Sequence, residues 1–309
     1  MRYSEGADLD TSGVRDVRGG GGGGFGRGRG LAVGGGGLGV VGLLVVVLIQ
    51  VLGGGGGGGP TGPAIGGFPG AGSGGTVGNG ELARECRTGA DANESVECAV
   101  VADIESIQDY WSGVLGADYR PTQTVFFDGS VQTSCGGATS GSGPFYCPAD
   151  QLVYIDLSFF DQLEQQFGAR GGLFVNAYVI AHEYAHHVQN LLGINRQVTP
   201  GESGPTSGTV RLELQADCFA GAWAGHAETV PDESGQPLIA EISDDDIARA
   251  LDAAARIGDD FIQENLGGGT VDQDAFTHGS SEQRQRWFRT GYETGDPGRC
   301  DTFATDDLG

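Results

Sequence analysis

Residues 174–192 read FVNAYVIAHEYAHHVQNLL, and this stretch decides how the chain is interpreted. It contains no Pro and no Gly, and Gly193 follows it directly as a helix stop signal. Inside it, His182, Glu183 and His186 form the pattern H-E-x-x-H. The apolar residues around these polar side chains predict a buried helix.

Two histidines four positions apart lie one turn apart on the same face of a helix. Their imidazoles can bind one Zn²⁺ at about 2.0–2.1 Å from each nitrogen. Glu183 is rotated by about 100° from His182, so its carboxylate can reach a zinc-bound water without binding the metal. The alternative is a helix whose histidines are simply buried, which would be costly without polar partners. We therefore expect His182 and His186 to be zinc ligands.

A catalytic zinc ion needs a third protein ligand and an open fourth position. Downstream, residues 211–227 read RLELQADCFAGAWAGHA and predict a second helix with Glu213 and Asp217 on one face. We expect Glu213 to bind zinc and Asp217 to accept a hydrogen bond from the far ring nitrogen of His182. A solvated helix face is the alternative for both carboxylates. The other histidines are weaker candidates for the third ligand: His187, His226 and His278.

The segments HEYAHHVQNLLG and RLELQADCFAGAWA resemble those of the neutral zinc metallopeptidase family of bacterial membrane-anchored proteins. Further similar stretches are QLVYIDLSFFDQL at 151–163, THGSSEQRQRWFRTGYETGD at 277–296 and CDTF at 300–303. The resemblance implies a zincin-like fold in which the H-E-x-x-H histidines bind zinc and its glutamate is the catalytic acid and base. It implies little about the substrate.

The implied reaction is the hydrolysis of a peptide or protein substrate. Zinc lowers the pKa of its bound water toward about 7 and polarises the scissile carbonyl. Glu183 would take the proton of the water and pass it to the leaving amine. The developing oxyanion needs a further donor, for which His278 is the first candidate and Tyr184 the second.

Two other functions remain open. A catalytically silent zinc domain could bind a peptide or a cell-wall component, although binding alone would not require Glu183. A zinc hydrolase acting on another amide, such as a cell-wall crosslink, would use the same metal chemistry as a peptidase.

Residues 31–52, LAVGGGGLGVVGLLVVVLIQVL, carry no charge and are long enough to span a bilayer as one helix. Five arginines precede this segment, and no basic residue follows it until Arg84. The positive-inside rule therefore predicts a cytoplasmic tail at 1–30 and an extracytoplasmic domain at 81–309, joined by a glycine-rich tether at 53–80. A cleaved signal peptide is the alternative, but its apolar run would be shorter.

The chain is strongly acidic, with 41 Asp and Glu against 17 basic residues and a net charge of −24. Such a surface repels nucleic acid, which is therefore not an expected partner. The expected partners are a peptide or protein substrate and the membrane, and nothing in the sequence indicates an oligomeric state.

All six cysteines follow the apolar segment. Outside the cytoplasm, an even number of cysteines indicates disulfides rather than free thiols. Fifteen sets of three pairs are possible, and a zinc–thiolate site is a further alternative, although no C-x-x-C pair exists. The preferred set joins nearest neighbours along the chain: Cys86–Cys98, Cys135–Cys147 and Cys218–Cys300.

The domain as a whole predicts an α+β fold with a small sheet and a mostly helical C-terminal half. Strands are expected at 122–127 and 151–157, and the second is expected to be an edge strand that binds an extended peptide. Three residues are expected to be helix N-caps: Asp103, Ser158 and Ser243. Helices are expected at 103–115, 158–167, 174–192, 208–227, 244–265 and 280–290.

Overall fold

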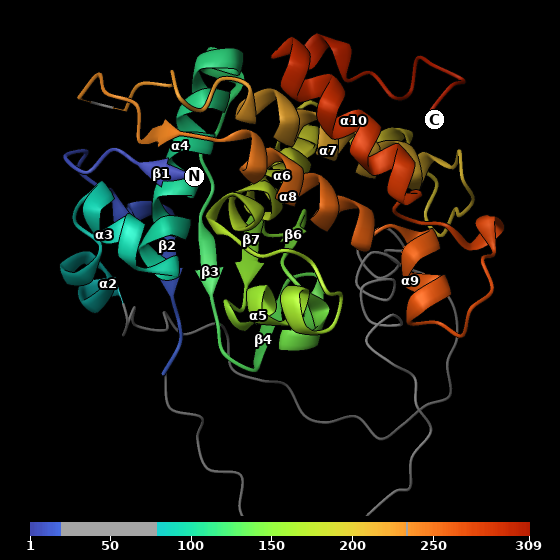
Figure 1. Ribbon diagram of the computed structural model, residues 1–309, viewed down its shortest axis with the longest axis horizontal. Helices are drawn as coiled ribbons and strands as arrows, with labels where there is room; N and C mark the ends of the chain where they lie inside the picture. The colour runs from blue at the N-terminus through green and yellow to red at the C-terminus, as the bar shows by residue number, and fades with distance from the viewer. Residues whose placement is uncertain (20–78, 233) are drawn as a thin grey trace, which may run out of the picture.

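The computed structural model describes residues 1–19, 79–232 and 234–309 (Figure 1). The predicted membrane helix at 31–52 lies outside the described residues, as does all of the tether at 53–80 except its last two positions. Within the described ranges, no helix is both long enough and apolar enough to cross a bilayer.

Among the described residues, the largest sheet has the strand order β2-β3-β7-β6. Strands β2 (Val14–Asp16), β3 (Thr124–Phe126) and β7 (Leu152–Ile155) are parallel, and β6 (Phe145–Cys147) pairs antiparallel with β7 at the edge. Every residue of β3 and β6 is buried. The side chains of these two strands therefore belong to the core, as their β-branched and aromatic composition favours.

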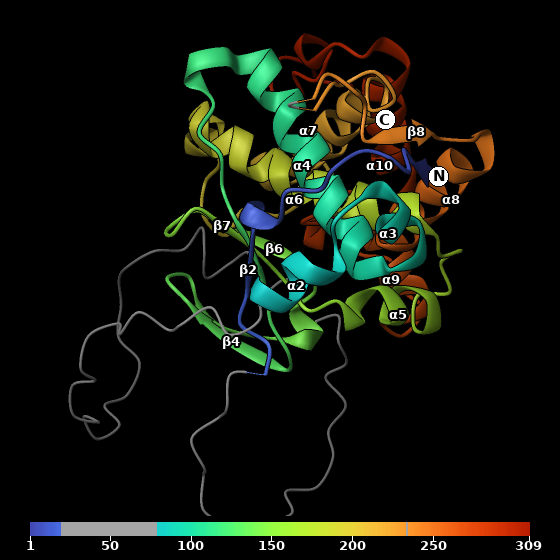
Figure 2. The same ribbon diagram turned by 90° about the vertical axis from the view of Figure 1, so that its left-hand side faces the viewer.

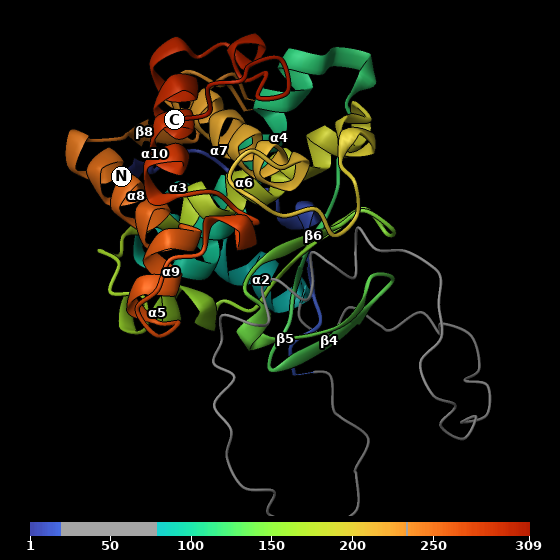
Figure 3. The same cartoon turned by 90° about the vertical axis from the view of Figure 1, so that its right-hand side faces the viewer.

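Two smaller strand pairs accompany this sheet. Strand β1 (Arg2–Tyr3) pairs antiparallel with β8 (Ile239–Glu241). Strands β4 (Ser130–Thr133) and β5 (Gly136–Thr139) form a hairpin, which lies at the lower edge of the molecule in Figure 3, away from the C-terminus. The structure thus confirms an α+β fold with small sheets.

Helix α6 (Leu173–Leu191) is the centre of the fold. It packs against α4 (Val96–Leu115), α7 (Gly208–Ala224) and α8 (Asp244–Arg256), and α7 packs in turn along α10 (Ser281–Thr294). Apolar side chains occur on every face of α6, which is why it can be enclosed by neighbours on all sides. The remaining α-helices of the described residues are α2 (Asn79–Glu85), α3 (Gly89–Glu94), α5 (Ser158–Gln165) and α9 (Asp259–Asn265).

Helices α7 and α10 approach each other closely because each presents a glycine to the backbone of the other. A Cβ added to Gly221 of α7 would lie 2.1 Å from the carbonyl oxygen of Phe288. A Cβ added to Gly291 of α10 would lie 1.9 Å from the carbonyl oxygen of Cys218. Any side chain at either position would therefore push the two helices apart.

The N-terminal ends of two helices differ from the prediction. Helix α4 begins at Val96 rather than at 103, and its N-cap is Ser95, whose side chain accepts a hydrogen bond from the third helical residue. Asp103, the expected N-cap, is instead fully buried in the middle of the helix. Helix α5 has Leu157 at its N-cap, and Ser158 is its first residue. Helix α5 therefore begins at 158 as predicted and only its N-cap differs, whereas the prediction for α4 missed its first seven residues.

The predicted helix at 244–265 is divided into α8 and α9 at Gly258. A Cβ on Gly258 would lie 2.5 Å from the backbone nitrogen of Ser281, so the chain bends where α10 begins. Ser243 caps α8 as expected, in a capping box with Asp246.

Residues 1–18 fold into the domain, which differs from the predicted separate tail at 1–30. Strand β1 pairs with β8, and β2 is the edge strand beside β3, so that this segment crosses one side of the domain (Figure 2). Tyr3 and Val14 are both fully buried. The first residues of the chain are therefore part of the same hydrophobic core as α4 and α6.

The six cysteines are joined as three nearest-neighbour pairs. Two of the disulfides each link residues 12 positions apart. The third links Cys218 on α7 to Cys300, 82 positions away, and fixes the C-terminal segment against α7. Arg211 and Gln215, also on α7, donate hydrogen bonds to backbone carbonyls of this segment.

Candidate metal centre

Helices α6 and α7 bring together two histidines and one glutamate. The ligand atoms of His182, His186 and Glu213 all lie within 4.8 Å of one another. The Nε2 atom of His182 is 3.1 Å from Oε2 of Glu213, and the Nε2 atom of His186 is 3.5 Å from Oε1 of the same carboxylate. One carboxylate oxygen therefore faces each imidazole.

These separations fit a zinc site. A tetrahedral zinc ion at about 2.0–2.1 Å from each ligand separates the ligand atoms by about 3.3 Å. The two observed distances lie on either side of this value. The two imidazoles and one carboxylate also match the three-ligand set of a catalytic zinc that keeps its fourth position open.

Asp217 fixes the orientation of His182. Its Oδ1 atom is 2.9 Å from Nδ1 of His182 and accepts a hydrogen bond from the Tyr178 hydroxyl at 2.6 Å. Arg284, itself buried, donates to both carboxylate oxygens of Asp217, at 2.8 and 3.0 Å. Burial alone would raise the pKa of Asp217, but the Arg284 guanidinium and His182 lower this pKa to about 2. The ionised carboxylate holds the proton on Nδ1 and leaves Nε2 of His182 for the metal.

Gln189 has the corresponding position beside His186. Its Oε1 atom lies 2.8 Å from Nδ1 of His186. Its amide nitrogen donates to the carbonyl of Leu212 at 2.7 Å and to the side chain of Gln215 at 3.1 Å. Because both acceptors lie on α7, the amide oxygen is left facing the imidazole. His186 therefore donates from Nδ1 and also presents Nε2 to the metal.

The charges of the site favour a divalent cation. Burial would lower the pKa of His182, but the carboxylates of Asp217 and Glu213 raise it to about 10. Burial would likewise raise the pKa of Glu213, yet His186 and His182 hold it well below its usual range. This pKa keeps His182 protonated while no metal is bound, and a metal ion at Nε2 would displace that proton. With both imidazoles then neutral, Glu183, Glu213 and Asp217 ionised and Arg284 positive, the protein groups of the site would carry a net charge of −2. A Zn²⁺ ion would neutralise it.

Glu183 lies beside the cluster and faces strand β6. Burial raises the pKa of this carboxyl, while His186, His182 and the donating backbone N–H of Tyr146 act in the opposite direction. Its side chain is not among the metal-ligand group. Glu183 therefore has the position expected of a general base rather than of a ligand.

His278 is held by a carboxylate on the far side of Glu213. Its Nδ1 atom is 3.5 Å from Oδ1 of Asp259. The other oxygen of Asp259 accepts backbone N–H groups of Thr277, His278 and Gly279, at 2.7, 2.6 and 2.9 Å. Burial would lower the pKa of His278, but Asp259 and Glu213 raise it. Asp259 thus positions both the loop and the imidazole.

The remaining candidate residues are engaged elsewhere. His187 uses both ring nitrogens, at 3.1 Å from the Tyr146 hydroxyl and 2.7 Å from the Arg120 carbonyl oxygen. His226 bonds the carbonyl of Gly295 after α10. The hydroxyl of Tyr184 is buried against β3, 3.0 Å from Thr124 Oγ1, so this tyrosine packs rather than facing the site.

The edge strand is β6 and not the predicted strand at 151–157. The central residues of the predicted strand form β7, which pairs with β3 on one side and with β6 on the other. The backbone hydrogen-bonding groups of β7 are therefore used by its two neighbouring strands, and none is free to pair with a peptide. Within the described residues β6 has β7 on one side only, and its Tyr146 N–H points to Glu183.

Comparison with known proteins adds the following. A family model described as "Putative neutral zinc metallopeptidase" matches residues 1–303. The uncharacterized protein Rv2575 of Mycobacterium tuberculosis is 52% identical over 226 residues, which cover 73% of this chain and 76% of that protein. The uncharacterized protein YpfJ of Escherichia coli K12 is 46% identical over 194 residues, or 61% of this chain and 64% of that protein. No solved structure matches the chain.

Proposed function

This chain belongs to the neutral zinc metallopeptidase family, and from that premise we propose that it is a zincin-like peptidase that uses one Zn²⁺ to hydrolyse peptide bonds. The observation that carries the proposal is the cluster of His182, His186 and Glu213 with Glu183 beside it. The two imidazoles, oriented by Asp217 and Gln189, would hold the metal together with the Glu213 carboxylate. Bound there, zinc would polarise the scissile carbonyl and lower the pKa of a nearby water.

Glu183 provides the proton transfers. Its carboxylate takes a proton from the attacking water and returns it to the leaving amine. Burial raises the pKa of Glu183. The carboxyl can therefore hold the proton more readily between its removal from water and its transfer to the amine. The backbone N–H of Tyr146, the middle residue of β6, donates to the same carboxylate and holds it beside this strand.

His278 is our candidate for stabilising the oxyanion. It lies close enough to Glu213 for the carboxylate to raise its pKa, and Asp259 fixes its ring. A donor aimed at the position where negative charge develops contributes more than one aimed at the ground state. Zinc would supply the other half of the stabilisation.

We propose that the substrate is an extended peptide lying along β6. This strand has an unpaired side within the described residues, and backbone pairing with a sheet edge is a common way to bind extended peptides. A peptide on that edge would run past Tyr146 and therefore past Glu183.

We also propose that the domain acts outside the cytoplasm and is attached to a membrane through residues 31–52. The charge-free run supports attachment. Three disulfides that use all six cysteines support an oxidising compartment. The predicted cytoplasmic position of residues 1–30 is not part of this proposal, because residues 1–18 pack on the domain.

The function can be tested on the full chain, purified in mild detergent and loaded with Zn²⁺. We expect it to cleave members of a library of unstructured peptides, detected by mass spectrometry. Glu183→Gln should retain zinc but lose about 10²–10⁴-fold in rate. Glu264→Gln, an exposed substitution on α9, is the matched control and should leave the rate unchanged.

Two outcomes would contradict the proposal. Undiminished cleavage by the Glu183→Gln variant would show that this carboxylate is not the base. Stoichiometric zinc with no cleavage of any peptide by the wild type would favour a zinc domain that only binds its partner.

A further inference from the structure

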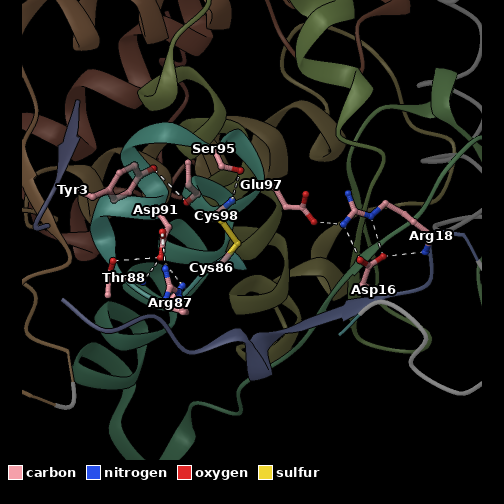
Figure 4. Close-up of a disulfide and its surroundings, with 11 residues drawn as sticks. Tyr3, Asp16, Arg18, Cys86, Arg87, Thr88, Asp91, Ser95, Glu97 and Cys98 are labelled. Atoms are coloured by element: carbon pink, nitrogen blue, oxygen red, sulfur yellow. Dashed lines mark hydrogen bonds and ion pairs between the residues drawn. A yellow bond between two sulfur atoms is a disulfide. The ribbon is translucent and has the colours of Figure 1, made fainter. Parts of the chain in front are cut away.

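The domain contains specific hydrogen-bond partners for β1, the first strand of the chain. The Asn93 side chain accepts a hydrogen bond from the Tyr3 backbone N–H at 2.9 Å and donates one to the Tyr3 carbonyl at 3.0 Å. The hydroxyl of Tyr3 donates to Oδ1 of Asp103 at 2.8 Å. Figure 4 shows Tyr3 directed into α4 beside the Cys86–Cys98 disulfide. The domain therefore recognises both the backbone and the side chain of residue 3.

Asp103 indicates that this contact is part of the fold. It is completely buried, and its Oδ2 atom has no hydrogen-bond partner in the described structure. Tyr3 is the partner of the other oxygen. Without the N-terminal segment, a carboxyl in the middle of α4 would lose this hydrogen bond as well.

A glycine makes room for the next residue. A Cβ on Gly89 would lie 2.0 Å from the carbonyl oxygen of Ser4. The backbone N–H of Gly89 donates to the Ala7 carbonyl at 2.9 Å, and the N–H of Leu9 donates to the Arg87 carbonyl at 2.9 Å. The loop before α3 is thus fitted to the passage of residues 4–9.

The second strand of the segment is held in the same manner. The side chain of Asn79 accepts from the Asp16 N–H at 2.7 Å and donates to the Val14 carbonyl at 3.0 Å. Arg18 then forms ion pairs with both Asp16 and Glu97, as Figure 4 shows. The points where the described chain leaves and returns, near residues 18 and 79, are therefore bonded to each other.

We infer that residues 1–18 lie in the same compartment as residues 79–309, as strands of the catalytic domain. A single membrane crossing between residue 18 and residue 79 would separate β2 from β3 and β1 from β8, which is incompatible with their pairing. Two full crossings would need about 40 apolar residues, and within the uncharged stretch the apolar run extends only over 31–52, followed by Gly-rich sequence.

This inference opposes the orientation that the arginines predict. The positive-inside rule is a statistical bias of loop composition. Two of the arginines that contribute to it, Arg2 and Arg18, have carboxylate partners on the domain, at Glu241 and Glu97. Their charges are thus engaged by the fold and do not by themselves indicate a cytoplasmic tail.

A crosslink across the β1–β8 pair tests the docking. Arg2 and Glu241 are paired in register, and their side chains are 56% and 61% exposed. Antiparallel partners have Cα atoms about 4.5–5.5 Å apart, within the range of a disulfide. The full chain carrying Arg2→Cys and Glu241→Cys would be oxidised in isolated membranes, then cut at a protease site inserted after Gly56.

We expect the N-terminal fragment to stay attached to the domain until a reductant is added. A pair of Arg2→Cys with Glu264→Cys is the mismatched control, because α9 lies on the far side of the molecule from β1 (Figure 1). If the matched pair crosslinks no more than the mismatched pair, the docking is wrong.

Labelling of the single variants tests the compartment independently of docking geometry. A membrane-impermeant maleimide is added to intact spheroplasts that carry either Arg2→Cys or Glu241→Cys. The native cysteines are all in disulfides, so the new thiol is the target. We expect both variants to react or both to be protected; reaction of only one places the two segments on opposite sides and overturns the inference. Neither readout depends on peptidase activity.

Discussion

At the scale of single residues, the candidate metal centre depends on side chains outside its ligand set. Asp217 and Gln189 each fix one imidazole, yet they do so differently. Asp217 is charged and is neutralised by Arg284, whereas Gln189 is neutral and is oriented by acceptors on α7. Because only His182 has an ionised partner, it is expected to be the more strongly bound ligand.

Gln189→Leu is expected to weaken zinc binding by about 10–100-fold, the usual effect of removing a group that orients a ligand. The His186 ring would lose its acceptor and could turn away from Glu213. Competition with a chromogenic chelator measures the affinity. Gln166→Leu, on the exposed end of α5, is the control; equal affinity of the two variants would mean that Gln189 does not orient the ligand.

At the scale of elements, α6 and α7 could be predicted because their apolar residues continue without Pro or Gly over several turns. Strands β1, β2 and β6 were not predicted, since each has only two or three residues. Such segments acquire a strand conformation from their partners rather than from their own pattern. Strand β3 is equally short, but the longer run TQTVFF around it gave the pattern that predicted it.

The same limit explains which site residues were missed. Glu213 and Asp217 share a helix with a recognisable spacing, so their approach to the histidines followed from the pattern. Arg284 is 67 residues from Asp217 in the sequence. Asp259 accepts a hydrogen bond from Thr277, in a loop that follows it by 18 residues. Their partners are chosen by the packing of α10 and α9, which no local pattern encodes.

The α7–α10 contact yields a stability prediction. Gly291→Ala places a methyl group against the backbone of α7 and should destabilise the domain by about 1–3 kcal/mol. Gly113→Ala is the matched control, because Gly113 is an exposed residue of α4 with nothing within 4 Å of its added Cβ. That substitution should stabilise the domain by up to about 1 kcal/mol. Urea unfolding separates the two, and a neutral result at Gly291 would contradict the close packing.

The seam between the N-terminal segment and α4 is acidic. A cavity of about 740 Å³ there is lined by residues of both elements, such as Asp10 and Glu105, and by Asp232 from the loop between α7 and β8. Burial, together with the charges of Asp109, Asp10 and Asp232, raises the pKa of Glu105 to about 7, although the Asp10 backbone N–H opposes the shift. The docked segment is thus held against a carboxyl that resists ionisation.

This pKa gives the stability a definite dependence on pH. The pKa of Glu105 in the folded protein lies above its ordinary value of 4.5. Its contribution to folding stability is therefore fully present below pH 4.5 and is lost as the pH rises through 7. Glu105→Gln keeps the acceptor for Asp10 and should therefore stabilise the protein at pH 8 by roughly 1 kcal/mol. At pH 4 it should have little effect. Urea unfolding at the two pH values would show equal effects if Glu105 ionised normally.

At the scale of the whole molecule, the net charge of −24 opposes compaction. Several arginines sit in pairs that reduce this repulsion locally, such as Arg249 with Asp245 and Arg256 with Asp252 on α8. These pairs are exposed or half-buried, so each contributes little by itself. The disulfides contribute more to the folding stability, above all the Cys218–Cys300 disulfide, which closes the longest loop.

Added salt is therefore expected to stabilise this protein rather than weaken it. Raising NaCl from 20 to 500 mM shortens the screening length and reduces the repulsion among carboxylates more than it weakens the few surface pairs. We expect the melting temperature to rise by a few degrees, measured by calorimetry at pH 8. A falling melting temperature would mean that specific ion pairs outweigh the net charge.

The pairing of β1 with β8 also implies a delay between the synthesis of β1 and the formation of its strand pair. The first strand leaves the ribosome early, but its partner follows more than two hundred residues later. At about 5–20 residues per second, that interval is on the order of 10–50 s. Until then β1 lacks its strand partner, although Asn93 and Asp103, which bond Tyr3, are synthesised much earlier. On the localisation that we propose, residues 1–18 would therefore have to reach the compartment of the domain before β1 can pair with β8.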